Sequence, residues 1–296
     1  MPAAPFGRLL TAMITPFDEA GAVDHEVAWE LARRLIAEGS DGLVVAGTTG
    51  EAPTLSEDEK VALFGTVVGA VAGKAVVIAG TGTYDTAESI HLTRRAVDAG
   101  VDGVMAVTPY YSRPPQEGLL GHFTAIADAS EVPVLLYNIP SRTGRLIEVP
   151  TLARLAEHER IVAVKDAVGD LAFTGRAALA VGDGMAIYSG DDVLTLPMMA
   201  IGAVGVVSVA SHLAGPTIAA MVAAMVGGDL GAARRLHLAL VPLFEACFLE
   251  PNPIPVKAAL GKTWREVGPP RLPLVPASAA TVEAVLEAVE SAAAAR

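Results

Sequence analysis

Charged residues and cysteine are scarce in this sequence of 296 residues. Charged residues make up 18% of the chain and apolar residues 52%. This composition excludes an intrinsically disordered chain, because disorder requires low hydrophobicity and high charge. The single cysteine, Cys247, excludes an internal disulfide and a thiolate metal site. We interpret it as a core residue of a protein in a reducing compartment, and we expect a cytoplasmic location.

Basic residues are also few relative to acidic ones. The 21 Lys and Arg residues stand against 33 Asp and Glu residues, which gives a net charge of −12. Proteins that bind nucleic acid need a basic surface to meet the phosphate backbone. This charge balance therefore argues against a nucleic-acid partner.

Motifs for metals and nucleotide cofactors are missing as well. The six histidines include no pair with His-x-x-x-His spacing, and no cage of carboxylates is recognisable. Gly80-Thr81-Gly82 lacks the third glycine of a dinucleotide-binding loop. We expect neither a metal nor a cofactor.

One long stretch, residues 193–228, has no charged side chain and is a candidate membrane span by hydropathy. Pro197, Gly202 and Pro216 divide it into pieces the size of single strands and helices. The segment after Arg8 lacks the small-residue cleavage site of a secretory signal. We therefore expect no membrane span and no secretory signal.

Short apolar, β-branched runs alternate with longer segments of helical periodicity, which is the pattern of repeated β-α units around a parallel sheet. The expected helices lie near 25–38, 56–72, 86–99, 116–129, 149–157, 171–181, 191–201 and 215–227. The expected strands are Leu9–Thr15, Gly42–Ala46, Ala75–Ala79, Gly103–Val107, Val132–Tyr137, Ile161–Lys165, Ala186–Ser189 and Gly205–Val209. Eight such units fit an α/β fold of the (β/α)8 TIM barrel type, whose usual length is about 250 residues.

Several helix starts are readable in the sequence. Asp24 and Asp85 are suited to cap helix N-termini, and Ser56 followed by Glu59 forms a capping box. These signals set the starts of the expected helices at 25, 56 and 86.

An open, doubly wound sheet is the competing fold. It requires a glycine-rich phosphate loop after the first strand, where this sequence has Thr15-Pro16-Phe17-Asp18. The barrel is therefore favoured. After residue 228 only helices are expected, near 230–248, 253–261 and 279–294. We treat residues 1–228 as the barrel and residues 229–296 as a C-terminal helical extension packed with it as one unit.

Lys165 ends an apolar, strand-like run, unlike the other four lysines at 60, 74, 257 and 262. Catalytic groups of a (β/α)8 barrel lie at the C-terminal ends of the strands. A lysine among apolar neighbours is poorly hydrated, which favours the free amine that attacks a carbonyl to form a Schiff base. A structural lysine paired with neighbouring Asp166 is an equally good interpretation of the position alone.

Other strand ends also carry polar residues. Tyr137 ends the preceding strand, where a phenol either moves protons or packs with its hydroxyl in water. Gly47-Thr48-Thr49-Gly50-Glu51 follows the second strand and is either a small-anion site or an ordinary turn. Arg142, in the loop after Tyr137, either binds a carboxylate with two hydrogen bonds or is a solvated surface residue.

Taken together, the motifs resemble the dihydrodipicolinate synthase and N-acetylneuraminate lyase superfamily, and the match runs essentially end to end. Their order and spacing around a barrel are more specific than any single motif. A tail motif, Asn252-Pro253-Ile254-Pro255-Val256-Lys257, also resembles the synthase branch. The motifs that carry the resemblance are Gly47–Glu51, Thr108–Tyr111, Tyr137–Gly144, Val164–Asp166 and Ser189–Asp192.

The resemblance implies a class I, pyruvate-dependent lyase in which Lys165 forms an imine and then an enamine with pyruvate. It implies that Tyr137 relays protons through Thr48 and through Tyr111, which reaches in from a neighbouring subunit in this family. Pyruvate is then held by Thr49, the backbone near Val207 and the carbonyl of Gly190. Arg142 matches the synthase branch, where this arginine binds the carboxylate of L-aspartate 4-semialdehyde. The implied product is 4-hydroxy-tetrahydrodipicolinate, on the route to diaminopimelate and lysine.

The resemblance also bears on assembly and regulation. It implies a homo-oligomer, usually a tetramer built as a dimer of dimers. Family members that are inhibited by lysine carry histidines and an asparagine where this chain has Glu57, Lys60 and Tyr84, while Glu88 and Tyr110 are retained. Because Lys60 repels an incoming ammonium and Tyr84 fills volume, we expect weak or absent lysine inhibition.

Two other functions are compatible with parts of the pattern. A 2-keto-3-deoxy sugar-acid aldolase or dehydratase of the same superfamily shares Lys165 and Tyr137 but does not need Arg142. A non-catalytic relative that keeps the barrel as a sensor or assembly subunit does not need the lysine or the tyrosine, and both are present.

Overall fold

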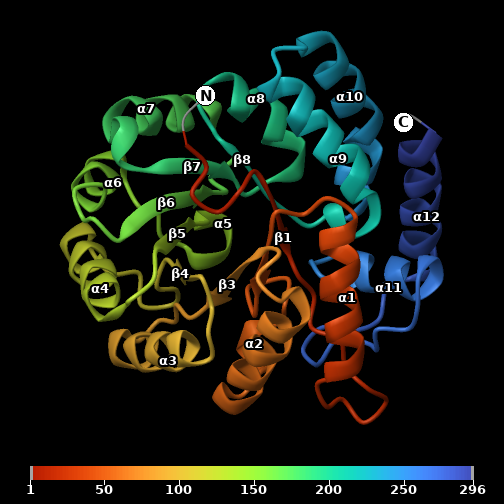
Figure 1. Ribbon diagram of the computed structural model, residues 1–296, viewed down its shortest axis with the longest axis horizontal. Helices are drawn as coiled ribbons and strands as arrows, with labels where there is room; N and C mark the ends of the chain where they lie inside the picture. Colours follow the sequence, from red (N-terminus) through yellow and green to blue (C-terminus); the bar gives the residue numbers. More distant parts are fainter. Residues whose placement is uncertain (1–2, 295–296) are drawn as a thin grey trace.

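The computed structural model describes residues 3–294, and in it eight parallel strands close into a barrel surrounded by helices (Figure 1). The strands follow one another in chain order, and β8 closes the ring by pairing with β1 at Leu9↔Val206 and Leu10↔Val207. The predicted (β/α)8 barrel is confirmed. The strands are β1 Leu9–Ala12, β2 Gly42–Val45, β3 Val76–Gly80, β4 Gly103–Val107, β5 Val134–Asn138, β6 Ile161–Asp166, β7 Ala186–Ser189 and β8 Gly205–Ser208.

Helices fill the connections between strands and form the C-terminal extension. The α-helices are α1 His25–Ala37, α2 Glu57–Val71, α3 Thr86–Asp98, α4 Gln116–Ala129, α5 Pro140–Thr143, α6 Val149–Leu155, α7 Leu171–Val181, α8 Thr195–Ala200, α9 Ser211–Val226, α10 Leu230–Ala246, α11 Ile254–Thr263 and α12 Ala279–Ala294. Short 3-10 turns are η1 Ala52–Thr54, η2 Gly182–Gly184 and η3 Asp192–Leu194.

The predicted helix starts are confirmed at atomic detail. Asp24 accepts a hydrogen bond from the backbone N–H of Val27 at 3.0 Å. Ser56 and Glu59 form a capping box, because the backbone N–H of each donates to the side chain of the other. These bonds satisfy backbone donors that have no partner within the helix.

Two predicted helices differ from the structure. The single helix expected at 191–201 is divided into η3 and α8, because Asp191 caps the 3-10 turn through the backbone N–H of Val193. The helix expected at 215–227 begins earlier, at Ser211, and is kinked at Ala214. A proline inside a helix removes one hydrogen bond and clashes with the preceding turn, so Pro216 accounts for the kink. The short α5 was not expected.

The core has two layers, one inside the barrel and one between the barrel and its helices. Tyr188 closes the barrel interior at the N-terminal side. Its hydroxyl donates to the carbonyl of Gly7 at 2.8 Å and accepts from the N–H of Phe6 at 3.2 Å. Burial raises the pKa of Tyr188 to about 12. A cavity is present at the opposite end of the barrel, where the strands terminate.

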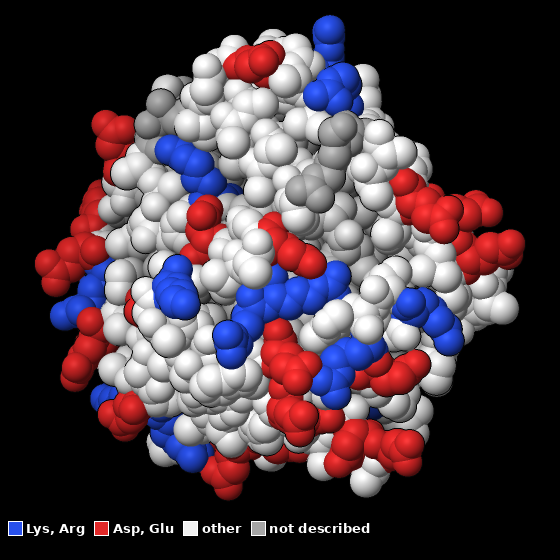
Figure 2. All heavy atoms as spheres, turned by 45° about the vertical axis from the view of Figure 1, so that its right-hand side comes forward, with Lys and Arg blue, Asp and Glu red and all other residues white. Residues whose placement is uncertain are grey.

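The C-terminal extension lies outside the barrel against α9 (Figure 1). Cys247, at the end of α10, is fully buried and burial raises the pKa of its thiol, so the predicted core role is confirmed. Among the helices of residues 3–294, none is long and apolar enough to cross a membrane. On the face that Figure 2 shows, acidic side chains gather along both margins and basic ones are interspersed, without a continuous basic surface.

Candidate active site

Lys165 and Tyr137 lie next to each other at the C-terminal ends of β6 and β5. They are register partners in the sheet, and the Nζ of Lys165 is 4.2 Å from the centre of the tyrosine ring. Both are buried, with 5% and 4% of their surface exposed. An amine and a phenol are thus held in contact in a site with little access to water.

The alternative pairing of Lys165 with Asp166 is not formed. Successive residues of a strand point to opposite faces, and the Asp166 carboxylate accepts hydrogen bonds from Thr174 of α7 and from the backbone N–H of Val168, at 2.6 and 3.0 Å. In the described part of the chain no carboxylate forms an ion pair with Lys165. Its amine is therefore not committed to a structural partner.

Gly190 follows β7 and lies against Lys165. A Cβ at this position would lie 2.7 Å from the Cβ of Ala167 and 3.1 Å from the Cγ of Lys165, closer than carbon atoms normally approach. Its backbone N–H donates to the carbonyl of Asp166 at 2.7 Å. Only glycine fits here without moving Lys165. Val207 of β8 is buried inside the barrel, in the same apolar cluster as Tyr137.

The turn Gly47–Glu51 follows β2 and is held by residues of the C-terminal extension. Thr48 lines the cavity above the barrel, while Thr49 is buried and accepts a hydrogen bond from the amide of Asn252 at 2.9 Å. Glu51 has a left-handed backbone conformation, with φ of 54°. Its carboxylate accepts from the Nζ of Lys257 at 2.8 Å and from a backbone N–H.

Arg142 lies in α5, in a loop that is fixed at both ends. The Asn138 side chain exchanges two hydrogen bonds with the backbone of Ile147, at 3.0 and 3.1 Å. The hydroxyl of Thr143 donates to the carbonyl of Ile139 at 3.0 Å. Although Arg142 itself is exposed, its loop is therefore well held beside the cavity.

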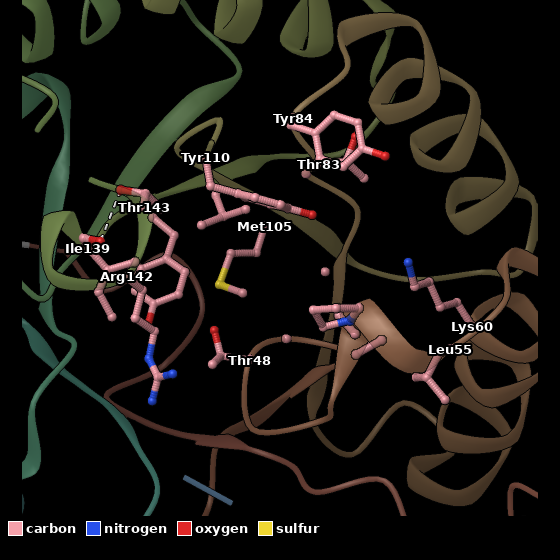
Figure 3. Close-up of a pocket in the computed structure, with 18 of the residues that line it drawn as sticks. Thr48, Leu55, Lys60, Thr83, Tyr84, Met105, Tyr110, Ile139, Arg142 and Thr143 are labelled. Atoms are coloured by element: carbon pink, nitrogen blue, oxygen red, sulfur yellow. Dashed lines mark hydrogen bonds between the residues drawn. The ribbon is translucent and has the colours of Figure 1, made fainter. Parts of the chain in front are cut away.

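A cavity of about 520 Å³ opens above these residues (Figure 3). Thr48, Tyr137 and Arg142 are among its lining residues, and Figure 3 shows Met105 between Thr48 and Arg142 on one side and Lys60 and Tyr84 on the other. A second group of lining residues is relevant to regulation. This second group consists of Lys60, Tyr84, Glu88 and Tyr110. The ring centres of Tyr84 and Tyr110 are 5.3 Å apart in an edge-to-face contact, and burial lowers the pKa of Lys60.

Five predicted site residues, Lys165, Thr49, Gly190, Val207 and Tyr111, are not among the residues that line this cavity, and of these Tyr111 lies at the protein surface. It is 96% exposed and its backbone is in the left-handed region, with φ of 67°. The side chain therefore lies at the surface of its own chain and not in the buried contact of Lys165 with Tyr137.

Sequence reasoning assigned no role to three residues that support the site. Asn138 holds the arginine loop, and Asn252 and Lys257 hold the Gly47–Glu51 turn. Asn252 and Lys257 belong to a motif that the sequence did single out. The residues that they contact, Thr49 and Glu51, lie more than 200 positions away along the chain, so no local sequence pattern indicates these contacts.

A (β/α)8 barrel with an unpaired, buried lysine at the end of one strand and a tyrosine on the next defines a class I lyase site, one built for Schiff-base chemistry. The chain belongs to the dihydrodipicolinate synthetase family, whose model matches residues 5–292. Two curated relatives are similar over nearly the whole chain, and both are named 4-hydroxy-tetrahydrodipicolinate synthase. The relative from Heliobacterium modesticaldum is 52% identical over 97% of this chain and 95% of its own length. That from a Synechococcus species is 56% identical over 91% of this chain and 90% of its own length.

Solved structures agree with this assignment. Dihydrodipicolinate synthase from Bacillus anthracis is 46% identical, with a TM-score of 0.94 over 98% of this chain and 99% of the other. A structure of the enzyme from Cyanidioschyzon merolae with lysine bound is also 46% identical, with a TM-score of 0.96 over the same shares of the two chains.

Proposed function

We propose that this chain condenses pyruvate with L-aspartate 4-semialdehyde to form 4-hydroxy-tetrahydrodipicolinate, in the diaminopimelate route to lysine. The observation that carries the proposal is the contact between buried Lys165 and Tyr137 beside a cavity that also receives Arg142. Curated relatives at 52% and 56% identity that carry this enzyme name support the same reaction.

The first half-reaction is imine formation. The amine of Lys165 attacks the ketone carbon of pyruvate, and the resulting carbinolamine loses one water to give an imine. The protonated imine withdraws electrons, so a methyl proton leaves and an enamine forms. Tyr137 receives and returns protons through Thr48 and through Tyr111 of a neighbouring copy of the chain. Thr49, the backbone of Val207 and the carbonyl of Gly190 hold pyruvate.

The second half-reaction forms the carbon–carbon bond. The enamine carbon attacks the aldehyde carbon of the semialdehyde, whose carboxylate is bound by Arg142. The amino group of the semialdehyde then attacks the imine carbon, which closes the ring and releases Lys165 as a free amine. The two substrates are thus converted to one cyclic product and one water, without a metal or a diffusible cofactor.

The test is intact-mass measurement after borohydride treatment with pyruvate, in the wild type and in Lys165→Ala, followed by a coupled assay with aspartate semialdehyde. A reduced adduct that depends on Lys165, together with turnover, is expected. An adduct without turnover would transfer the assignment to a 2-keto-3-deoxy sugar-acid aldolase or dehydratase. Absence of any adduct would overturn the Schiff-base mechanism.

We also propose that the active form is a cytoplasmic homotetramer, a dimer of dimers, in which residues 1–228 and 229–296 act as one unit. The exposure of Tyr111 supports assembly, since this side chain has 96% of its surface free to enter another copy. A structural relative at 36% identity is described as a monomeric variant, so the assembly state is a real variable. Sedimentation velocity on the purified chain is expected to show a tetramer, and a monomer with full turnover would contradict the proposal.

A further inference from the structure

The C-terminal extension contacts the turn Gly47–Glu51 through buried polar side chains. Asn252, just before α11, has only 6% of its surface exposed, and its Nδ2 donates to the Oγ1 of Thr49 at 2.9 Å. The turn ends at Glu51, whose carboxylate accepts a hydrogen bond from the Nζ of Lys257. The extension therefore contacts the turn at two points.

The direction of the hydrogen bond at Thr49 determines what this hydroxyl does. A hydroxyl has one proton to donate and two lone pairs that accept. Because Thr49 accepts from Asn252, its own proton remains available for another acceptor. Within residues 3–294 the Thr49 hydroxyl donates to no side chain or carbonyl, so the proton is free for a substrate carboxylate.

The other buried asparagine shows how a purely structural side chain differs. Both ends of the Asn138 amide are bonded to the backbone of Ile147. The Asn252 amide uses only its nitrogen, and its buried Oδ1 has no partner among the described residues. The two buried asparagines therefore differ: Asn138 is bonded to the backbone at both ends of its amide, whereas Asn252 is bonded at one end to the side chain of Thr49.

The ion pair of Lys257 and Glu51 fixes the end of the same turn. Its atoms are 2.8 Å apart, and the two side chains are 2% and 1% exposed. The second carboxylate oxygen of Glu51 accepts from the backbone N–H of Arg271 at 2.8 Å. A buried ion pair is a weak source of net stability because both charges lose their hydration. The ion pair instead fixes the position of Glu51, whose backbone is in the uncommon left-handed conformation.

We propose that Asn252 is a positioning residue of the reaction: its amide holds the Thr49 hydroxyl with the proton directed at the carboxylate of pyruvate. The Lys257–Glu51 pair keeps the turn at the distance that this contact requires. The inference rests on the proposed function, and specifically on the role of Thr49 in binding pyruvate. It makes the C-terminal extension a part of the substrate site.

The test is a double-mutant cycle on Asn252 and Thr49 in the full-length chain. Asn252→Asp keeps the shape of the side chain but removes the donor, so the Thr49 hydroxyl must turn its proton toward the new carboxylate. We expect KM for pyruvate to rise about 10- to 100-fold, the usual effect of losing a hydrogen bond to a charged group, with a smaller change in kcat. In a Thr49→Val background the same substitution is expected to have little further effect, because the hydroxyl through which Asn252 acts is gone.

Asn138→Asp is the matched control, since it makes the same chemical change at the only other asparagine of the chain. It is expected to raise KM for the semialdehyde rather than for pyruvate, because Asn138 holds the arginine loop. Circular dichroism and thermal unfolding establish that both variants fold. If Asn252→Asp fails to fold, Asn252→Ala and Asn252→Ser enter the cycle in its place.

The rate of borohydride trapping as a function of pyruvate concentration separates this inference from the proposed function. If the wild type forms no adduct, the proposed function fails. If the wild type forms it and Asn252→Asp needs no more pyruvate than the wild type, or if the effects of the two substitutions simply add, the positioning role of Asn252 is overturned.

Discussion

Replacing Gly190 by alanine tests whether the position of Lys165 is set by its neighbours. The new Cβ would lie 2.7 Å from the Cβ of Ala167 and 3.1 Å from the Cγ of Lys165. Carbon atoms prefer about 3.5–4.0 Å, so the segment near Ala167 must move by roughly 1 Å and the lysine by a few tenths of an ångström. Overpacking of this kind costs about 1–3 kcal/mol of stability. A displacement of about 1 Å in a reacting group costs about 100-fold in rate, so a shift of a few tenths of an ångström in Lys165 is expected to cost less, up to about 10-fold.

The expected result for Gly190→Ala is therefore a loss of up to about 10-fold in turnover, with slower trapping of the pyruvate adduct. Thermal unfolding is expected at a lower temperature, by about 2–4 °C for each kcal/mol lost. The coupled assay, the trapping rate and calorimetry measure the three effects.

Gly175→Ala is the matched control for this substitution. Gly175 lies inside α7, where a Cβ has no atom within 4 Å. Since alanine is the better helix former, this variant is expected to gain up to about 1 kcal/mol of stability and to keep wild-type turnover. Wild-type turnover and stability in Gly190→Ala would refute the reasoning, because the predicted clash would then be absorbed without moving Lys165.

Four further predictions follow from other parts of the structure. Asn138→Ala removes both hydrogen bonds that hold the arginine loop and is expected to raise KM for the semialdehyde about 10-fold in steady-state assays; an equal rise in KM for pyruvate would contradict this assignment. Tyr111→Phe is expected to unfold at the wild-type temperature, because the side chain is 96% exposed, but to lose most of its turnover, so wild-type turnover would show that the relay is wrongly assigned. Burial lowers the pKa of His122 to about 4. Between about pH 6.5 and pH 4 the unfolded chain binds a proton at this histidine and the folded chain does not, so the free energy of unfolding should fall as the pH is lowered through this range. Urea titrations at several pH values should show a weaker dependence of the unfolding free energy on pH in His122→Gln than in the wild type. Free L-lysine below 1 mM, roughly the range in which a weak site stays empty, is expected to leave turnover unchanged, because Lys60 repels its ammonium and Tyr84 fills the volume of the pocket. Half-inhibition of turnover in this concentration range would contradict that argument.

The fold was predictable because each β-α unit carries its own local signals. The apolar runs at strand positions and the caps at Asp24 and Ser56 all lie within a few residues of the elements that they define. Errors occurred where a distant or side-chain contact decides the local geometry. The helix expected at 191–201 is divided because the Asp191 side chain bonds the backbone ahead of it, a choice that helical periodicity does not reveal.

The candidate site was predictable to the extent that strand ends identify it. Lys165 and Tyr137 lie in adjacent strands with the same register, so their contact follows once the barrel is assumed. The question of whether Lys165 is paired with Asp166 required the structure, because it depends on which partners Asp166 finds on α7. The contacts of Asn252 and Lys257 were beyond prediction, since they join segments more than 200 residues apart in the sequence.

The two most deeply buried lysines, Lys257 and Lys165, differ in their partners and therefore in the roles that they can take. Lys257 and Lys165 are exposed by only 3% and 5%, and each ammonium lies 4.2 Å from the centre of an aromatic ring. Lys257 also has Glu51 at 2.8 Å and a backbone carbonyl at 3.3 Å, so its charge is matched and its position is fixed. Lys165 has an aromatic neighbour and forms no ion pair with a carboxylate of the described residues. An amine that already donates to a carboxylate at 2.8 Å is held away from a substrate carbonyl. Of the two, Lys165 is therefore the one whose amine is available as a nucleophile, and Lys257 is suited to hold the turn Gly47–Glu51.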